Sequence, residues 1–166
     1  MPLSTDQDLL ARINTLVLWQ PFLERVNTML NTAAARGFRY VATNGFRSYE
    51  DQDALYAKGR TAPGGIVTKA KGGQSYHQFY CAIDFVLDAS DQPGLQPDYD
   101  DAHFVVLAEE AVKAGLDAGY YWQFKDTPHV QAPVTKWGIT WRELDVAFKS
   151  GRRDKVVALL DAVARW

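Results

Sequence analysis

The chain has one cysteine among its 166 residues. A single cysteine cannot form an intrachain disulfide, so the fold needs no oxidising compartment. No apolar run approaches the ~20 residues of a membrane-spanning helix. The first residues also lack the basic start and apolar stretch of a signal peptide. We therefore expect a protein made in the cytoplasm, without membrane insertion, that needs a separate route out if it acts outside the cell.

A surplus of positive charge is also missing. The chain has 18 Lys and Arg against 20 Asp and Glu, for a net charge of -2. No basic stripe marks a nucleic-acid surface, so we expect no nucleic-acid binding. The 47% hydrophobic and 23% charged residues are typical of a globular protein. At this length one domain can bury a sizeable core, and we expect a monomer of one domain.

Several standard catalytic motifs are absent, including His-Glu-x-x-His, paired Cys-x-x-Cys, Gly-x-Ser-x-Gly and a phosphate-binding glycine loop. Residues 73–87 are more informative, because a glycine-led polar segment carrying His77 runs into an apolar stretch. Asp84 stands inside that stretch, between Ile83 and Phe85. Burying a carboxylate there is unfavourable unless it has a partner. A metal ion is one such partner, with His77 as a fellow ligand.

Periodicity and end signals predict the local structure of the chain. Strand-like alternation over 82–87 places Asp84 on one face and Cys81 on the other, so we interpret Cys81 as a small buried hydrophobe. His103 falls in the first turn of a helix, where a structural or exposed role is expected. We expect helices over about 5–16, 21–36, 48–59, 101–115 and 140–163, the last interrupted at Gly151, and strands over 38–43, 82–87 and 129–131.

Two later segments carry further reactive side chains. Pro128 biases the residue before it toward an extended conformation, so Asp126 and His129 can face one cavity. Arg47 lies at a strand-to-helix junction, where side chains often face a site. Each residue also has an ordinary interpretation: a turn aspartate, a core histidine and a surface ion pair. The long segment 59–73 is either a solvated connection or a functional loop.

Together, His77, Asp84 and His129 would make a three-ligand zinc site with one position open for water. Water bound to zinc has a pKa near ~7, which makes hydroxide available at neutral pH. Asp126 would act as general base, and Arg47 would stabilise the oxyanion formed from a carbonyl. The spacing alone is not specific, and a metal-free pair of His77 with Asp84 stays open.

Residues 75–77 and 82–84 resemble the Ser-x-His-x-x-Gly-x-Ala-x-Asp signature of zinc peptidases of the VanY and VanX type, which include D-alanyl-D-alanine carboxypeptidases. The acid at 126 and the histidine at 129 are similar to that family's second motif. The segments 47–56 and 59–73 resemble one branch, the L-alanyl-D-glutamate peptidases, which includes phage endolysins. The resemblance covers about residues 38–131.

The resemblance implies an α+β fold, with a small antiparallel sheet flanked by helices in a single zinc-peptidase domain. The catalytic core would span residues 38–131, after N-terminal helices over 1–37 and before a helical tail over 132–166. The family pattern implies Zn²⁺ on His77, Asp84 and His129, Asp126 as general base, Arg47 as substrate or transition-state anchor, and Ser75 and Gln52 as substrate-binding residues.

The substrate class implied is the peptidoglycan stem peptide, cut at the L-alanyl-D-glutamate bond. An endolysin of this kind would reach the cell wall through a separate holin-type pore. Two alternatives stay open: a D-alanyl-D-alanine carboxypeptidase, and a catalytically weak zinc protein that binds the wall. Three departures bear on specificity: Tyr80 replaces the signature glycine, Asp126 replaces the more common glutamate, and residues 120–122 replace a Gly-Gly-Asp-Trp-like run.

Overall fold

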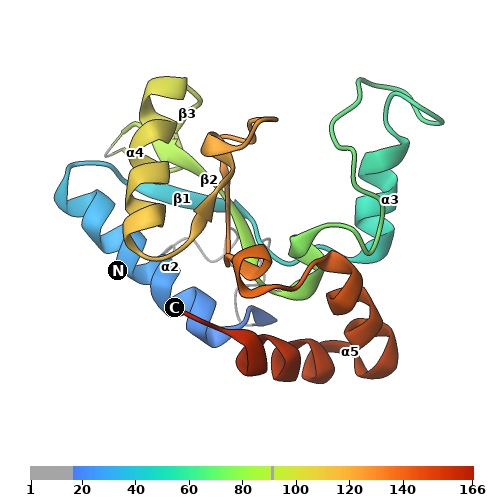
Figure 1. Ribbon diagram of the computed structural model, residues 1–166. Coiled ribbons are helices and arrows are strands. Elements are labelled where there is room, and N and C mark those ends of the chain that lie inside the picture. The colour runs from blue at the N-terminus through green and yellow to red at the C-terminus, as the bar shows by residue number, and fades with distance from the viewer. Residues whose placement is uncertain (1–16, 91) are drawn as a thin grey trace. The chain divides into compact units, whose positions relative to one another are not determined.

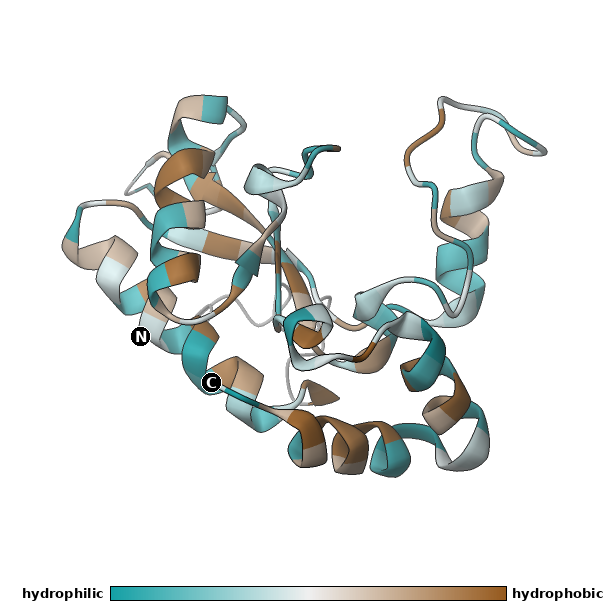
Figure 2. Ribbon diagram, in the orientation of Figure 1, coloured by the Kyte–Doolittle hydropathy of each residue, from teal (hydrophilic) through white to brown (hydrophobic). Residues whose placement is uncertain are grey.

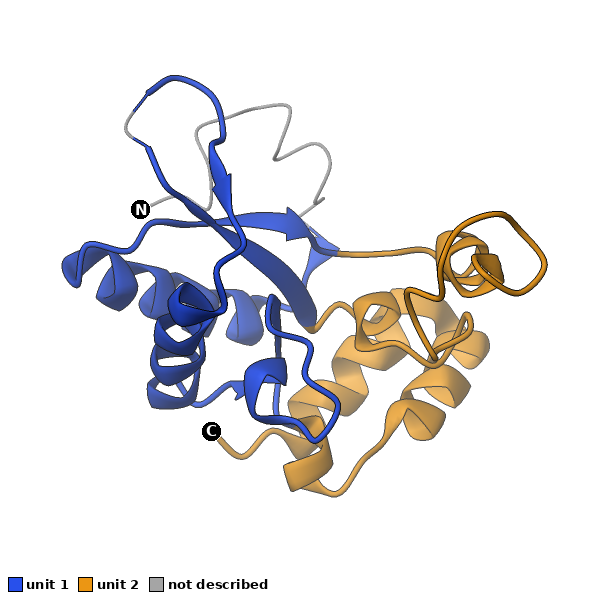
Figure 3. Ribbon diagram, turned by 90° about the horizontal axis from the view of Figure 1, so that it is seen from above, with its two compact units in different colours: residues 1–45, 82–133 blue, residues 46–81, 134–166 orange. Residues whose placement is uncertain are grey.

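The computed structural model describes residues 17–90 and 92–166 (Figure 1). The predicted first helix, over 5–16, lies outside the described residues. The chain forms two compact units: unit 1 comprises residues 1–45 and 82–133, and unit 2 comprises 46–81 and 134–166 (Figure 3). The chain therefore passes from unit 1 to unit 2 and back before it ends in unit 2. The single-domain interpretation stays a prediction.

Unit 1 is built on a small antiparallel sheet, as the resemblance implied. Its strands are β1 (Tyr40–Asn44), β2 (Ala82–Asp88), β3 (Pro97–Asp98), β4 (Asp117–Ala118) and β5 (His129–Gln131). The strand order is β1-β2-β5-β4, and β3 pairs with β2. All of these pairings are antiparallel. The long strand β2 is thus bordered by β1 on one side and β5 on the other, so its residues have neighbours on both edges.

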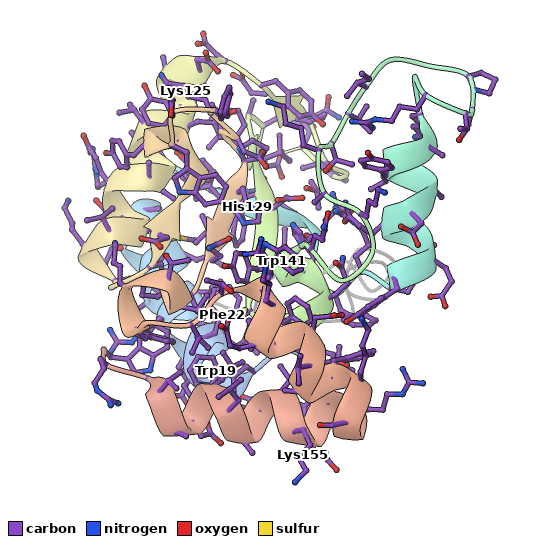
Figure 4. The ribbon with its side chains drawn as sticks, turned by 45° about the vertical axis from the view of Figure 1, so that its right-hand side comes forward. Trp19, Phe22, Lys125, His129, Trp141 and Lys155 are labelled. Carbon is purple, nitrogen blue, oxygen red and sulfur yellow. The ribbon has the colours of Figure 1, made fainter. Side chains whose placement is uncertain are left out.

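Helices α2 (Gln20–Ala35) and α4 (Asp101–Lys113) contact each other and pack against the sheet of unit 1 (Figure 3). Pro21 lies in the first turn of α2, and Gly37 follows its end with φ 88°, as the sequence predicted. Trp19 and Phe22 are buried together at the start of α2 (Figure 4). Apolar and polar residues alternate around α4 (Figure 2). The apolar side of each helix thus supplies part of the unit 1 core.

Unit 2 is helical. It contains α3 (Tyr49–Ala57), the short 3₁₀ helices η2 (Tyr76–Phe79) and η4 (Val134–Trp137), and α5 (Trp141–Val163). Ser48 and Thr140 cap α3 and α5 as predicted. The backbone of α5 is non-helical at Gly151 and Arg152, so α5 is two helices joined by a kink, which agrees with the predicted interruption. Stacked rings of Tyr49 and Phe148 join α3 to α5. None of the described helices is long and apolar enough to cross a bilayer.

Candidate metal centre

Asp84 and His129 lie directly opposite each other on neighbouring strands. The register of β2 and β5 pairs Asp84 with His129. Opposite residues of an antiparallel pair project from the same face of the sheet, so their side chains meet. His129 Nδ1 lies 3.1 Å from Asp84 Oδ1, although 45 positions separate the residues in the chain. Strand pairing therefore brings two of the three predicted metal ligands together.

The alternation of β2 sets the surroundings of Asp84. Ile83 and Phe85 on either side of it are fully buried, whereas the Asp84 side chain is 15% exposed. Cys81 is also fully buried, with Sγ 3.8 Å from the Tyr76 carbonyl oxygen. Burial raises the pKa of the Cys81 thiol, which keeps it protonated and unreactive. The structure agrees with the interpretation of Cys81 as a buried hydrophobe.

Both ring nitrogens of His129 have partners. While Nδ1 faces Asp84, Nε2 lies 2.9 Å from Gln131 Oε1. Burial favours the neutral ring, but the hydrogen bond to Asp84 and the charges of Asp84 and Asp126 outweigh it, so the pKa of His129 is raised. The sequence pattern predicted no role for Gln131. The position of Gln131, two residues after His129 on one strand, is the feature that could have predicted its role, because residues two apart on a strand project from the same face.

His77 is held by local hydrogen bonds in unit 2. It lies in η2, is 3% exposed, and is joined to β2 by four residues. Ser75 Oγ accepts a hydrogen bond from the His77 backbone N–H at 3.4 Å, and Gln78 Oε1 accepts one from the Ser75 backbone N–H at 3.0 Å. This capping box fixes the turn that carries the imidazole. The His77 carbonyl in turn accepts a hydrogen bond from the Arg47 backbone N–H at 3.2 Å.

Tyr80 ends this turn in a left-handed conformation, with φ 64°. Glycine adopts that conformation without strain, which explains why a glycine suits this position of the family signature. The Tyr80 ring is 6% exposed and stacks on Phe46 with ring centres 5.0 Å apart. The Arg153 guanidinium lies 5.6 Å from the centre of the Tyr80 ring. Tyr80 therefore packs within unit 2, between Phe46 and the second half of α5.

Asp126 is placed by its backbone. Its N–H donates to the Gly119 carbonyl at 3.0 Å, and its carbonyl accepts from the His129 N–H at 3.1 Å. Gly119 has no room for a side chain, because a Cβ there would collide with the Asp126 backbone. The Asp126 side chain is exposed. The loop thus returns Asp126 close to His129, whereas Lys125 lies at the loop's outer end (Figure 4).

The predicted site residues divide between the two units. Asp84, Asp126 and His129 belong to unit 1, and Arg47, Gln52, Ser75 and His77 belong to unit 2. In unit 2 the Arg47 side chain donates to Gln52 Oε1 at 2.9 Å. Direct contact of Ser75 and Gln52 with substrate stays a prediction. His103 pairs with Asp98 at 3.1 Å, consistent with a structural role.

The donors of unit 1 fit a divalent metal of the zinc class. An imidazole nitrogen and a carboxylate oxygen are both ligands that zinc accepts. The side chains of His129 and Asp84 are only 7% and 15% exposed, so little water competes for them. The contact of His129 Nε2 with Gln131 is of the kind that orients metal-binding histidines. His129 and Asp84 therefore have the chemistry, burial and support that a metal centre requires.

Comparison with known proteins places the chain in a family. The family model described as VanY, D-alanyl-D-alanine carboxypeptidase, matches residues 16–142. The peptidoglycan L-alanyl-D-glutamate endopeptidase CwlK of Bacillus subtilis (strain 168) is 40% identical over 119 residues, which are 67% of this chain and 71% of CwlK.

Two solved structures share the fold. The L-Ala D-Glu endopeptidase ChiX of Serratia marcescens has a TM-score of 0.54 at 17% identity, over 76% of this chain and 88% of ChiX. The vancomycin resistance D,D-pentapeptidase VanY, solved in complex with Zn(II), has a TM-score of 0.52 at 19% identity, over 74% of this chain and 80% of VanY. The α+β fold and the sequence resemblance are thereby confirmed, and the chain belongs to the VanY family of D-alanyl-D-alanine carboxypeptidases.

Proposed function

We propose that this chain is a zinc-dependent peptidase that hydrolyses peptidoglycan stem peptides at the L-alanyl-D-glutamate bond. The observation that carries the proposal is the cross-strand pair of Asp84 and His129, 3.1 Å apart and nearly buried. The 40% identity with CwlK, an endopeptidase of that specificity by name, supports the choice of bond. Family membership supports the reaction class, peptide hydrolysis.

His77, Asp84 and His129 would hold the metal. Each of them offers one ligand atom, an imidazole nitrogen or a carboxylate oxygen. Zinc, when bound to such a set, supplies a Lewis acid and lowers the pKa of water to ~7. The contact of Gln131 with Nε2 would leave Nδ1 of His129 to hold the metal. The capped turn over 75–78 would hold the His77 imidazole in place.

Asp126 and Arg47 would supply the remaining chemistry. Asp126 would take the proton of the attacking water and pass it to the departing amine nitrogen. Its exposure and its backbone link to His129 support this role. Arg47 would hold a substrate carboxylate or stabilise the oxyanion formed from the scissile carbonyl. A guanidinium suits both tasks, because it is always charged and donates several hydrogen bonds in a fixed plane.

A second candidate is a D-alanyl-D-alanine carboxypeptidase. The description of the matching family supports it, as does the shared fold with VanY. The two activities use the same chemistry and differ in the bond that is cut. We further propose that the protein acts on the cell wall as a monomer, with release through a holin-type pore if it comes from a phage.

The test is mass spectrometry of purified muropeptides after digestion by the zinc-loaded protein, with and without a chelator. We expect a product with a new D-glutamate N-terminus that is lost in the chelator. Release of free D-alanine alone would overturn the endopeptidase assignment in favour of the carboxypeptidase. A protein with one equivalent of zinc that binds the wall but cuts nothing would overturn both enzymatic candidates.

A further inference from the structure

Helix α3 buries a polar residue. Of its nine residues, all of which the structure describes, Gln52 is the one that is buried, at 1% exposure. A helix normally packs through apolar side chains on its inner face. An amide in that place is unfavourable unless its hydrogen-bonding groups are paired. The partners of Gln52 therefore show what holds α3 in unit 2.

The Gln52 amide is fully paired. Its Oε1 accepts from Arg47 Nη1 at 2.9 Å and from Gln78 Nε2 at 3.3 Å. Its Nε2 donates to the Ala70 carbonyl at 2.8 Å and to Thr68 Oγ1 at 3.4 Å. A guanidinium can only donate and a carbonyl can only accept, so Arg47 and Ala70 together fix the orientation of the amide. Both lone pairs and both hydrogens are used within the protein.

These partners lie in three separate segments of the chain, and two of these segments contain a predicted site residue. Arg47 is the proposed anchor, Gln78 follows the metal ligand His77, and residues 68–70 lie in the 59–73 loop. A second residue of α3 holds the same loop, because Asp53 Oδ1 accepts from the Gly72 N–H at 2.8 Å. Helix α3 thus anchors the loop at two points, and one of them, Gln52, also contacts Arg47.

We propose that Gln52 is a positioning residue that acts through its own hydrogen bonds on Arg47 and on the 68–72 segment, rather than through contact with substrate. The inference rests on the proposed function, because it assigns Gln52 to the support of the Arg47 guanidinium. Arginine has a long, flexible side chain, and a buried fixed acceptor restricts its orientations. Without that acceptor, the guanidinium would spend less time in the orientation that stabilises the transition state.

Three substitutions separate the contact of Gln52 with Arg47 from the contacts that hold the 68–72 segment. Gln52→Met removes every hydrogen bond of the amide at similar volume. Gln52→Glu keeps an acceptor for Arg47, now with a charge, but loses the donor to the Ala70 carbonyl. Asp53→Ala breaks the contact with Gly72 and keeps the Gln52 amide that contacts Arg47. Each variant is compared with the wild type for zinc content, melting temperature and muropeptide hydrolysis.

We expect Gln52→Met to lower kcat by about 10- to 100-fold, with zinc content unchanged. Gln52→Glu should restore most of kcat and leave KM raised, because Arg47 is held but the loop is not. Asp53→Ala should raise KM with kcat near the wild-type value. If Gln52→Glu loses as much kcat as Gln52→Met, the amide contacts substrate and the proposal is wrong. An unchanged kcat per folded molecule in Gln52→Met would show a purely structural role.

A readout independent of hydrolysis keeps this inference separate from the proposed function. Hydrogen exchange at the 68–72 amides reports how firmly the 68–72 segment is held. The NMR signals of the Arg47 guanidinium report how firmly Arg47 is held. Gln52→Met should speed exchange and broaden the Arg47 signals, whereas Gln52→Glu should restore only the Arg47 signals. A wild-type protein that cuts no muropeptide refutes the proposed function, yet these measurements still decide whether Gln52 positions Arg47. Unchanged exchange and signals in Gln52→Met would overturn the inference.

Discussion

Asp84 and Asp126 are both carboxylates of unit 1, but they stand in different surroundings. Asp84 lies between two buried residues and contacts His129 at 3.1 Å. Asp126 is exposed on a loop, and its backbone carbonyl accepts a hydrogen bond from the His129 N–H. Different surroundings give two carboxylates different roles, because they set which one binds a cation and which one exchanges protons with water. At the residue scale this contrast supports Asp84 as ligand and Asp126 as base.

The first prediction separates these roles. Asp126→Ala should keep zinc and lose about 10²- to 10⁴-fold in rate, because only the proton acceptor is removed. His129→Ala should lose both zinc and activity. Metal analysis and muropeptide hydrolysis measure the two effects, with Lys125→Ala on the same loop as a control that retains both. An active Asp126→Ala protein would refute the base assignment.

The second prediction concerns Gln131, which contacts His129 Nε2 at 2.9 Å. Gln131→Leu should weaken zinc binding by about 10- to 100-fold, because the ring loses the partner that orients it. Competition with a chromogenic chelator gives the dissociation constant. Gln123→Leu, at an exposed position of the preceding loop, is the matched control. Equal zinc affinities in the two variants would contradict this role.

The third prediction uses the left-handed backbone of Tyr80. Tyr80→Ala should destabilise the protein by about 3–5 kcal/mol, because a buried ring is lost. Tyr80→Gly should be more stable than Tyr80→Ala by about 1 kcal/mol, since glycine carries no strain at this φ. Urea unfolding measures both, and Tyr121→Ala, which removes an exposed ring, should change little. If the alanine variant were the more stable one, Tyr80 would not be strained.

At the scale of elements, α2 and α4 are joined by a buried carboxylate. The Glu110 side chain is 2% exposed and lies 2.6 Å from Arg36, beyond the end of α2, and 2.7 Å from Lys113. The hydrogen bond from Lys113, supported by Arg36 and opposed by burial, lowers the pKa of Glu110 to about 2. Because the folded pKa lies below the ordinary value, the stabilisation is present above pH ~4.5 and is lost as the pH falls toward ~2.

The fourth prediction follows from that sign. Glu110→Gln should lower the free energy of unfolding by about 1–3 kcal/mol at pH 7, because a charged acceptor with two cationic partners is lost. The difference from the wild type should shrink at pH 3 and below. Urea unfolding at both pH values measures it. Glu109→Gln removes a more exposed partner of Arg36 and should cost less than about 1 kcal/mol. An equal loss for Glu110→Gln at both pH values would show that charge is not the cause.

Most elements of regular structure were predictable because their signals are local. Pro21, Ser48 and Thr140 mark helix starts, and Gly37 marks a helix end, where the structure has them. The strand predicted over 38–43 instead runs from Tyr40 to Asn44. The two-residue strands β3 and β4 were not predicted. Alternation of apolar and polar residues can be recognised only over several residues. Strands as short as β3 and β4 exist only because a neighbouring strand supplies their hydrogen bonds.

At the scale of the whole molecule, the chain crosses three times between its two units, and the pattern of residue types along the chain does not show this path. Residues 134–166 belong to the same unit as residues 46–81. The burial of Tyr80 against Phe46, beneath Arg153 of α5, is one contact that unites them. Periodicity describes each helix by itself and carries no information about which distant segment covers it. The membership of the tail therefore could not be predicted from its pattern.

The sequence by itself determined most of the helix and strand types and the chemical types of the candidate ligands. These follow from interactions over a few residues: caps, turns and alternation. Only the tertiary structure decided that Asp84 stands opposite His129, that Gln131 holds the same ring, and that the buried amide of Gln52 joins Arg47 to the 59–73 loop. Strand register and the pairing of buried polar groups depend on segments far apart in the chain, so they form only when the chain has folded.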